Sequence, residues 1–513
     1  MLDALRQDLR YSFRNLRSRP GFAAVAILSL ALGIGANTAI FSLIDAVMLK
    51  YLPVSHPEQL LQVTFQKSEG SSFTNPLWEA LRDRQQVFSG VFASGLTRFN
   101  LNQAGEARYA PAVWASGAYF STLGVSTAIG RTFTPAEDRR GCAATAVLGY
   151  DFWQKEYAGQ LDVLGRSVSL RRHPFEIIGV AQAGFFGLQV GSTADIFVPL
   201  CAEPVIGGEN SNLNKRGNWW LVVIGRPKPG LQPQRVTAVL KTIAPQALSA
   251  TIPPDWGAED KLEYERRSFE TLPAGKGTSY VRAQYRDPLL VLMGVVAVVL
   301  SIACANVANL LLARGALRQR EIAIRMAIGA GRARLVRQFL TESLVLSFTG
   351  AGLGVLFAHW GSRLLVGFLP TFGSRAFLDL GLDTRVLAFT IGITLATGLL
   401  FGLAPAWRGT RTNPQAAMKA NAPGVVDGHT RFNLGKSLVI LQVALSLVLV
   451  AGACLMLRTL GNLLSVDQHS QVDPRIARAV MDPFSAKRHR DMPQWAETHS
   501  RGAYKRNLSG RYP

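Results

Sequence analysis

The sequence predicts a membrane α-helical protein with about five transmembrane helices and an α+β domain inserted after the first of them. Composition gives the first reason, because only 17% of the 513 residues are charged, against roughly 25% in typical soluble domains. Charge gives the second, since 55 Lys and Arg against 34 Asp and Glu leave a net charge of +21. The third is pattern: long apolar runs alternate with basic connections, as membrane topology requires. Four cysteines in a chain of this length exclude a small disulfide scaffold.

Residues 1–20 predict an amphipathic helix that lies on an anionic membrane surface. Apolar residues recur at helical spacing on one side and arginines take the other: Leu2, Leu5, Leu9, Phe13 and Leu16 against Arg6, Arg10, Arg14 and Arg17. The same pattern also fits a surface helix of a globular domain. The apolar run that follows favours the membrane surface.

Five apolar runs are long enough to cross ~30 Å of hydrocarbon, which takes about 20 helical residues. They predict transmembrane helices at 21–49, 288–313, 338–369, 386–407 and 437–457. The first run is too long for the apolar core of a signal peptide, and no small-residue cleavage site follows it. We therefore expect it to stay in the membrane as an anchor.

The basic residues of the connecting segments predict the orientation. Segments 1–20, 314–337 and 408–436 carry five, seven and five Lys or Arg, whereas 370–385 carries two. The positive-inside rule places the three basic segments in the cytoplasm, and with them the N-terminus. Residues 50–287 then lie outside. Because most of the excess charge flanks membrane runs, nucleic-acid binding is not expected.

Residues 50–287 predict a soluble α+β domain. Short apolar runs bounded by Gly, Pro and Asn predict strands. The expected strands are 60–65, 144–148, 175–180, 195–200 and 219–224, with helices near 77–87 and 236–248. Cys142 and Cys201 both lie beside predicted strands of this domain. An oxidising exterior permits a disulfide between them, but the sequence does not fix their distance.

Segment 314–337 predicts a short amphipathic helix, a small-residue turn and a return into the membrane. Charged and apolar residues alternate before the turn: Arg318, Arg320, Glu321 and Arg325 with Ile322, Ile324, Met326 and Ile328. Gly329, Ala330 and Gly331 then break the pattern. The apolar face needs a partner, either the lipid surface or a protein groove, and composition alone does not choose between them.

Several runs of this chain resemble one family, the FtsX/MacB-like permeases. Its signature is similar to REIAIRMAIGAGRARLVRQFLTES in the segment just described. Outside the membrane, VWASGAYFSTLGVSTAIGRTF, the run 146–187 and DIFVPL resemble the MacB-like periplasmic core domain. The opening RNLRSRPGFAAVAILSLALGIGANTAIFSLIDAVML resembles the first span of the acidobacterial duplicated orphan permease branch. The resemblance covers residues 1 to about 460, and the motifs follow the family's order.

The resemblance implies a multi-pass permease subunit of a mechanotransmission-type ABC system in the bacterial inner membrane. In such a system a homo- or heterodimeric pair of permeases is driven by a separate cytoplasmic ATPase. ATP would then bind the partner, and this chain would need no cofactor. The segment between the second and third spans would be the coupling helix, with the expected contacts Glu321, Ile324, Arg325, Ile328, Gly329 and Ala330. The expected activity is export of an antibiotic- or peptide-like substrate, or lipoprotein handling.

No nucleotide, catalytic or metal site is expected in this chain, which is not predicted to be an enzyme. LGKS at 434–437 is similar to the end of a phosphate loop, but Thr430 occupies the required glycine position and the run enters a membrane span. No H-E-x-x-H, G-x-S-x-G or C-x-x-C motif occurs. Asn306 and Asn309 either form a line of polar contacts that changes during transport or make hydrogen bonds between helices. The second interpretation is favoured. For Glu342 the favoured interpretation is an interfacial carboxylate.

Two alternatives stand beside transport. One is a membrane-anchored sensor whose exterior domain binds a signal. The other is a truncated, non-functional remnant, and it rests on the tail 458–513, which is basic and has no stretch able to span. The tail is predicted to be disordered. Because the resembled branch is duplicated, we expect a truncation or a reading-frame shift near residue 466 that leaves its N-terminal half.

Overall fold

The computed structural model describes residues 2–18, 20–65, 72–102, 107–278, 280–317, 332–367, 383–409 and 434–469. The chain divides into a unit up to Val439 and a second unit from Ile440. The first unit holds most of the helices and the exterior domain, which is the name used here for residues 50–278.

Long apolar helices form the membrane part. They are α2 (Pro20–Ile44) with its π-helical continuation η1 (Asp45–Leu49), α9 (Tyr280–Leu317), α11 (Arg332–Gly367), α12 (Thr384–Gly409) and α14 (Leu434–His469). Among the described residues, four of these helices are long and apolar enough to cross a membrane: α2, α9, α11 and α14. The predicted span 386–407 lies in α12, whose apolar stretch Thr384–Leu400 is shorter than the ~20 residues that a span needs.

Two helices extend beyond the predicted spans that they contain. The exterior domain was expected to run to residue 287, but α9 already begins at Tyr280 and carries Pro288 inside it. The tail was expected to leave the last span at 458, but α14 continues to His469. Both helices continue past the apolar run into segments that contain charged residues, such as Asp287 and Arg458. Residues 470–513 lie outside the described part of the chain.

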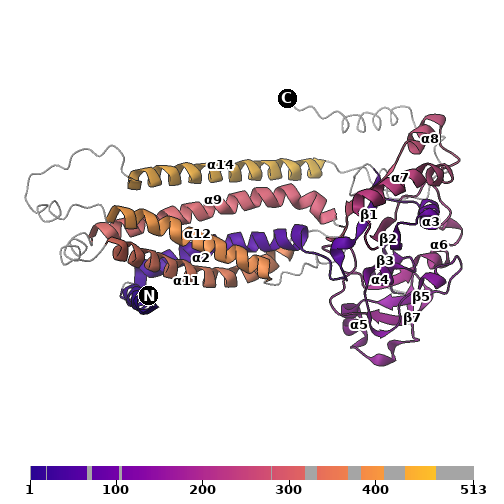
Figure 1. The fold of residues 1–513 in the computed structure, drawn as a ribbon, viewed down its shortest axis with the longest axis horizontal. Helices are drawn as coiled ribbons and strands as arrows, with labels where there is room; N and C mark the ends of the chain where they lie inside the picture. The colour runs from indigo at the N-terminus through magenta and orange to yellow at the C-terminus, as the bar shows by residue number, and fades with distance from the viewer. Residues whose placement is uncertain are drawn as a thin grey trace, which may run out of the picture. The chain divides into compact units, whose positions relative to one another are not determined.

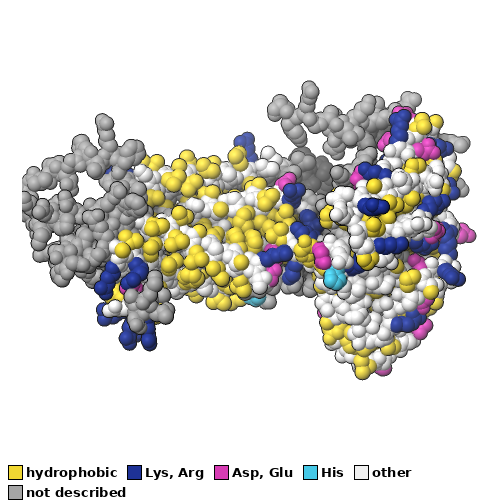
Figure 2. Space-filling model, viewed as in Figure 1, with side chains coloured by type: hydrophobic (Ala, Val, Ile, Leu, Met, Phe, Trp, Pro, Cys, Tyr) yellow, Lys and Arg dark blue, Asp and Glu magenta, His cyan; other side chains and the backbone are white. Residues whose placement is uncertain are grey.

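Helix α2 lies at the centre of the first unit's helices and contacts α9, α11 and α12 (Figure 1). It is apolar on all sides, as expected of a helix buried among others. Leu30 and Ile34 of α2 pack with Leu300 of α9 and Leu346 of α11. Figure 2 shows hydrophobic side chains over the outer surface of the helices, whereas charged side chains gather on the exterior domain. An apolar outer surface is suited to lipid.

Helix α1 (Leu2–Arg17) precedes α2 and is amphipathic, as predicted. Leu16 is buried against the helices, whereas Leu9 and Phe13 are exposed. Exposed apolar side chains beside a basic face are typical of a helix at a membrane surface.

The exterior domain is built on one mixed sheet of ten strands in the order β10-β1-β9-β2-β3-β8-β5-β7-β4, with β6 beside β7. The strands are β1 (Leu61–Phe65), β2 (Phe88–Asn100), β3 (Tyr109–Ala115), β4 (Thr127–Gly130), β5 (Thr145–Leu148), β6 (Ser167–Leu170), β7 (His173–Ala181), β8 (Ile196–Pro199), β9 (Val222–Pro227) and β10 (Phe269–Pro273). β3 runs parallel to β8, and β5 runs parallel to β7, while the remaining pairs are antiparallel. This confirms the predicted α+β fold class.

Helices cover both faces of the sheet and enclose two cores. The helices are α3 (Asn75–Arg84), α4 (Tyr119–Leu123), α5 (Tyr150–Tyr157), α6 (Glu203–Gly207), α7 (Pro233–Ser249) and α8 (Ala258–Glu265), with short 3-10 turns between them. The larger core includes Trp78, Phe175 and Leu240. The smaller includes Tyr119 and Phe197, and it reaches Leu52, where the chain enters the domain. The second core therefore links the sheet to the end of the first membrane helix.

Candidate functional site: the junction of helices and exterior domain

The chain passes between helices and exterior domain at two neighbouring places. It enters after η1 and leaves before α9, and the two passages are hydrogen-bonded, since Leu52 N donates to Gly275 O at 2.9 Å. We call residues 45–52, 274–282 and 383–386 the junction. These residues connect the helices to the exterior domain.

Arg282, in the first turn of α9, binds both passages. Its Nε donates to Val47 O at 3.1 Å, which belongs to the end of the first helix. Its Nη1 and Nη2 donate to Gly277 O at 3.2 Å and to Lys276 O at 2.7 Å. A guanidinium has five donors in a rigid planar arrangement, so it holds these three carbonyls in one fixed geometry.

Arg385 connects α12 to the same place. Its Nη1 donates to Leu49 O at 2.9 Å and lies 3.7 Å from Asp45 Oδ1, and its guanidinium lies over the Tyr51 ring at 5.9 Å. Asp45 is almost completely buried within η1. A π-helical turn of this kind is frequent at functional sites. Arg385 therefore fixes the start of α12 against the end of the first helix.

Asp383 caps α12 beside this ion pair. Its Oδ1 accepts from Arg385 N and Val386 N, both at 3.0 Å. Burial raises the pKa of this carboxyl, but the two backbone donors and a side-chain hydrogen bond with Asp45 outweigh it and hold the pKa below its ordinary value. An ionised Asp383 also favours the positive N-terminal end of α12.

A third arginine holds the entering chain against the sheet. Arg226 on β9 donates through Nη1 to His56 O and Gln59 Oε1, both at 3.0 Å, and through Nε to Thr122 O at 3.2 Å. Arg226 thus connects segment 55–59 to β9. Strand β9 in turn pairs with both β1 and β2 in the sheet.

Polar side chains form hydrogen bonds between the helices of the membrane part. Asn37 Nδ2 donates to Gly33 O in its own helix and to Val296 O of α9, both at 2.8 Å. The hydroxyls of Thr38 on α2 and Thr390 on α12 lie 3.1 Å apart. Such groups stabilise helix association in lipid. Of the polar residues singled out in the sequence, Asn306 is exposed and Asn309 half-buried, while Glu342 is buried.

Helix α11 contacts α1 near its N-terminal end. Arg337 Nε donates to Asp8 Oδ2 at 2.8 Å, and Asp8 is largely buried. The predicted coupling contacts lie outside the described residues: Glu321, Ile324, Arg325, Ile328, Gly329 and Ala330. The described chain resumes at Arg332, and Arg337 lies in the first two turns of α11.

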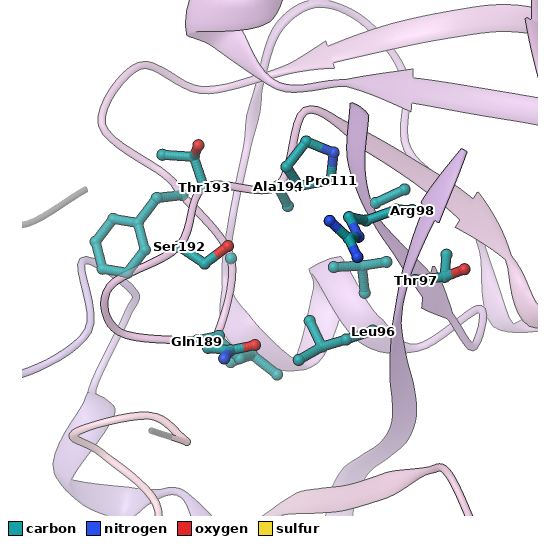
Figure 3. Close-up of a pocket in the computed structure, with 13 residues that line it drawn as sticks. Leu96, Thr97, Arg98, Pro111, Gln189, Ser192, Thr193 and Ala194 are labelled. Carbon is teal, nitrogen blue, oxygen red and sulfur yellow. The ribbon is translucent and has the colours of Figure 1, made fainter. Parts of the chain in front are cut away.

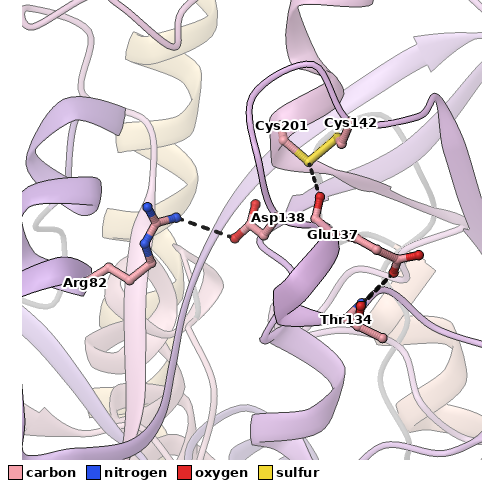
Figure 4. Close-up of a disulfide and its surroundings, with 6 residues drawn as sticks. All are labelled: Arg82, Thr134, Glu137, Asp138, Cys142 and Cys201. Carbon is pink, nitrogen blue, oxygen red and sulfur yellow. Dashed lines mark hydrogen bonds and ion pairs between the residues drawn. A yellow bond between two sulfur atoms is a disulfide. The ribbon is translucent and has the colours of Figure 1, made fainter.

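Cys142 and Cys201 form a disulfide in the structure, at a Cα–Cα distance of 5.7 Å. It joins the loop after Pro135–Glu137 to the turn that follows β8, and Glu137 O lies 3.7 Å from Cys201 Sγ (Figure 4). Beside it Arg82 Nη1 lies 3.8 Å from Asp138 Oδ2. Burial raises the pKa of Asp138, and Arg82 opposes this only in part. The cluster fastens this loop to the sheet.

The exterior domain also contains an apolar pocket of about 260 Å³. Strands β2 and β3 form one wall, and the loop 186–194 forms the other (Figure 3). This loop is bonded to the junction, since Val190 N donates to Thr278 O and Thr278 N donates to Leu188 O, both at 3.0 Å. The loop that lines the pocket is therefore hydrogen-bonded to Thr278, which lies two residues before α9 begins.

The sequence did not predict the roles of Arg226, Arg282 and Arg385. Each of the three has a backbone partner far away in the sequence, namely His56 for Arg226, Val47 for Arg282 and Leu49 for Arg385. The available signal was their position, because Arg282 and Arg385 flank predicted spans on the side that the positive-inside rule leaves poor in cations.

Comparison with known families finds two matches in this chain. Residues 23–243 match the MacB-like periplasmic core domain, and residues 293–414 match the FtsX-like permease C-terminal domain. The two segments follow one another without overlap. They cover most of the exterior domain and parts of the membrane helices, and residues 244–292 lie between them.

Relatives of known name are about one quarter identical. The pyoverdine export ATP-binding/permease protein PvdT of Pseudomonas syringae is 26% identical over 309 residues, which are 59% of this chain and 40% of the relative. The macrolide export ATP-binding/permease protein MacB of Salmonella typhi is 26% identical over 306 residues, 59% of this chain and 42% of the relative. The matched part of this chain thus spans about two fifths of each relative's length.

Solved structures of exterior domains are also similar. The periplasmic region of MacB from Actinobacillus actinomycetemcomitans has 14% identity, covers 46% of this chain and 94% of that chain, and gives a TM-score of 0.30. The extracellular domain of the transporter YknZ from Gram-positive bacteria has 15% identity, covers 42% and 99%, and gives a TM-score of 0.28.

Proposed function

Because this chain belongs to the FtsX/MacB-like ABC permeases, we propose that it transmits the motion of its membrane helices to its exterior domain, driven by ATP hydrolysis in a separate cytoplasmic subunit. The proposal includes a second permease copy, identical or related, beside this one. ATP would bind only to the partner ATPase, and this chain would have no enzymatic role of its own.

The observation that carries this proposal is the junction. Arg282 holds the end of the first helix and the chain that enters α9, and Arg385 holds the start of α12 to the end of the first helix. Three helices are thereby fixed together at the place where the chain enters and leaves the exterior domain. A rigid connection of this kind converts a helix displacement into a displacement of the sheet.

The contact that receives motion from the ATPase would lie at the other end of the helices. We place it in segment 314–337, with Ile328 as an apolar contact and Glu321 and Arg325 as polar contacts for the ATPase. Arg337 and its ion pair with Asp8 connect α11 to the amphipathic helix α1. Motion received there would pass along α11, which packs closely against α2.

For the transported species, the names of the relatives favour small molecules. PvdT is named for pyoverdine export and MacB for macrolide export. We propose export of an antibiotic- or peptide-like compound from the inner membrane or from its outer side, with the exterior domain in the periplasm and the N-terminus in the cytoplasm. Lipoprotein handling and signal sensing are the alternative functions.

The test is affinity purification of the full chain from its native membrane, with a search for an ABC-type nucleotide-binding subunit. We expect that the subunit co-purifies and that Ile328→Asp abolishes the association, because a charge replaces an apolar contact. Ile328→Val is the matched control and should keep it. Both variants are first checked for membrane insertion. If the ATPase still binds and is stimulated by Ile328→Asp, the coupling assignment is wrong.

A further inference from the structure

The apolar pocket of the exterior domain has no role in the transmission proposed above. Its apolar lining includes Leu96 of β2, which is 60% exposed although it lies in the middle of a strand. The Leu96 side chain points into the pocket (Figure 3). Covering a leucine of this kind with apolar surface is favourable, because it removes apolar area from water.

Polar groups around the pocket converge on the same space. The Arg98 guanidinium, the Ser192 hydroxyl and the Gln189 amide point into it, whereas the Thr97 side chain points away (Figure 3). None of the 13 described residues that line the pocket is acidic. One cation and two neutral hydrogen-bonding groups around an apolar floor complement an anion with an apolar body.

We propose that this pocket binds a small anionic amphipathic molecule, a carboxylate with a short apolar chain, and that its binding is transmitted to α9. Arg98 receives the carboxylate, for which a guanidinium has a matching planar geometry. Leu96 contacts the apolar chain. The volume of about 260 Å³ lies just below the ~300–1,000 Å³ usual for small-molecule sites, so the ligand is short.

Transmission follows from the loop 186–194, which we call the strap. Gln189 and Ser192 face the pocket, and Leu188 also lines it. Leu188 and Val190 are both buried. Leu188 packs with Leu52 in the smaller core, at the entrance to the exterior domain. The strap is paired with Thr278 through two backbone hydrogen bonds of 3.0 Å. Thr278 is two residues from the start of α9.

The strap has a defined backbone conformation that limits its freedom. Gly187 and Gly191 have φ of +101° and +91°, which L side chains rarely adopt. Ala194 N donates to Phe186 O at 2.9 Å and closes the strap at its base. A ligand that presses on Gln189 and Ser192 therefore shifts the strap as a unit, and the pairing with Thr278 follows it. This second half of the proposal rests on the transmission function, whereas binding does not.

Binding is tested with hexanoate as the probe, on the full chain in lipid nanodiscs, by saturation-transfer NMR and calorimetry. Hexanol and hexylamine are the neutral and cationic matched probes. We expect that hexanoate binds more tightly than hexanol and that hexylamine does not compete. Arg98→Met should weaken hexanoate binding about tenfold, the size expected for one lost charge-assisted hydrogen bond. Arg235→Met, an exposed arginine of α7, should leave it unchanged.

Two results would overturn the binding site. One is equal affinity for hexanoate and hexylamine, and the other is an equal loss of hexanoate affinity in Arg98→Met and Arg235→Met. Transmission is measured separately by hydrogen exchange of the Val190 and Thr278 amides, which are the two donors of the strap pairing. Slower exchange of both with hexanoate supports transmission, and a change at Val190 alone refutes it. Neither measurement involves an ATPase, so failure here is distinguishable from failure to co-purify an ATPase.

Discussion

Gly35 of α2 and Gly354 of α11 meet backbone to backbone. A Cβ added to Gly35 would lie 2.7 Å from Gly354 O, and one added to Gly354 would lie 2.9 Å from Ala31 O. The two helices approach so closely because neither residue has a side chain. This contact lies within the extensive packing of α2 against α11 in the described part of the chain.

We predict that Gly354→Ala destabilises the helix packing by about 1–3 kcal/mol, because backbone atoms must move apart to admit the methyl group. Gly352→Ala is the control on the same helix, since a Cβ there would meet nothing within 4 Å. Thermal unfolding of the purified chain in detergent is the measurement. Equal midpoints for the two variants would mean that the close approach does not limit stability.

A second prediction concerns Arg282. Replacement by Met keeps the length of the side chain but removes its donors to Val47 O, Gly277 O and Lys276 O. Charge-assisted hydrogen bonds contribute roughly 1.5–3 kcal/mol each. We therefore expect faster hydrogen exchange at Lys50, Leu52 and the amides of 274–278, with the sheet unaffected. Arg286→Met, one turn further along α9 and exposed, is the matched control. If both variants exchange alike, Arg282 does not hold the junction.

The third prediction is the state of the cysteines. Cys142 and Cys201 are bonded, whereas Cys304 is a buried free thiol and Cys454 an exposed one in α14. In denatured, unreduced protein, a maleimide should label two of the four cysteines, and all four after reduction. The bond closes a separation of 59 residues, for which the chain-entropy argument gives a stabilisation of about 4 kcal/mol. Cys142→Ser/Cys201→Ser should therefore unfold at a lower temperature. Four labelled thiols before reduction would disprove the bond.

Local pattern was enough to predict much of the fold. Strands expected at 60–65 and 144–148 agree with β1 and β5 to within a residue. The helix expected at 236–248 lies within α7. Each of these segments has the periodicity and the bounding residues of its own element, so no distant contact is needed to define it.

The strands β2 and β3 were not predicted, although they form the centre of the sheet. β2 contains Gly90 and Gly95, which lower strand propensity. Both glycines lie where a side chain would collide, with Thr122 and with Trp220. Tertiary packing therefore requires glycine at these two positions, although glycine has a low strand propensity. The contacts of Arg282 and Arg385 could not be predicted for a related reason, because both side chains bind backbone carbonyls, which every residue has.

The last prediction concerns Asp195, at the start of β8. Burial is the main cause that raises the pKa of its carboxyl to about 6, with Glu156 and Asp151 adding to it and Lys155 and Arg108 opposing it. The folded protein therefore binds a proton that the unfolded chain, with a pKa of 3.8, has released. Stability falls as the pH rises from about 4 through 6, and the full cost is present above that range.

Asp195→Asn removes this cost because the amide has no charge to bury. We expect the variant to be more stable than the parent at pH 7.5 by about 2 kcal/mol, and to lose this advantage at pH 4, where Asp195 is protonated in the folded state. Thermal unfolding of the full chain at both pH values measures the difference. Asp255→Asn, at an exposed aspartate, controls for the loss of one carboxyl group. An advantage of Asp195→Asn that is the same at both pH values would show that something other than the buried charge is responsible.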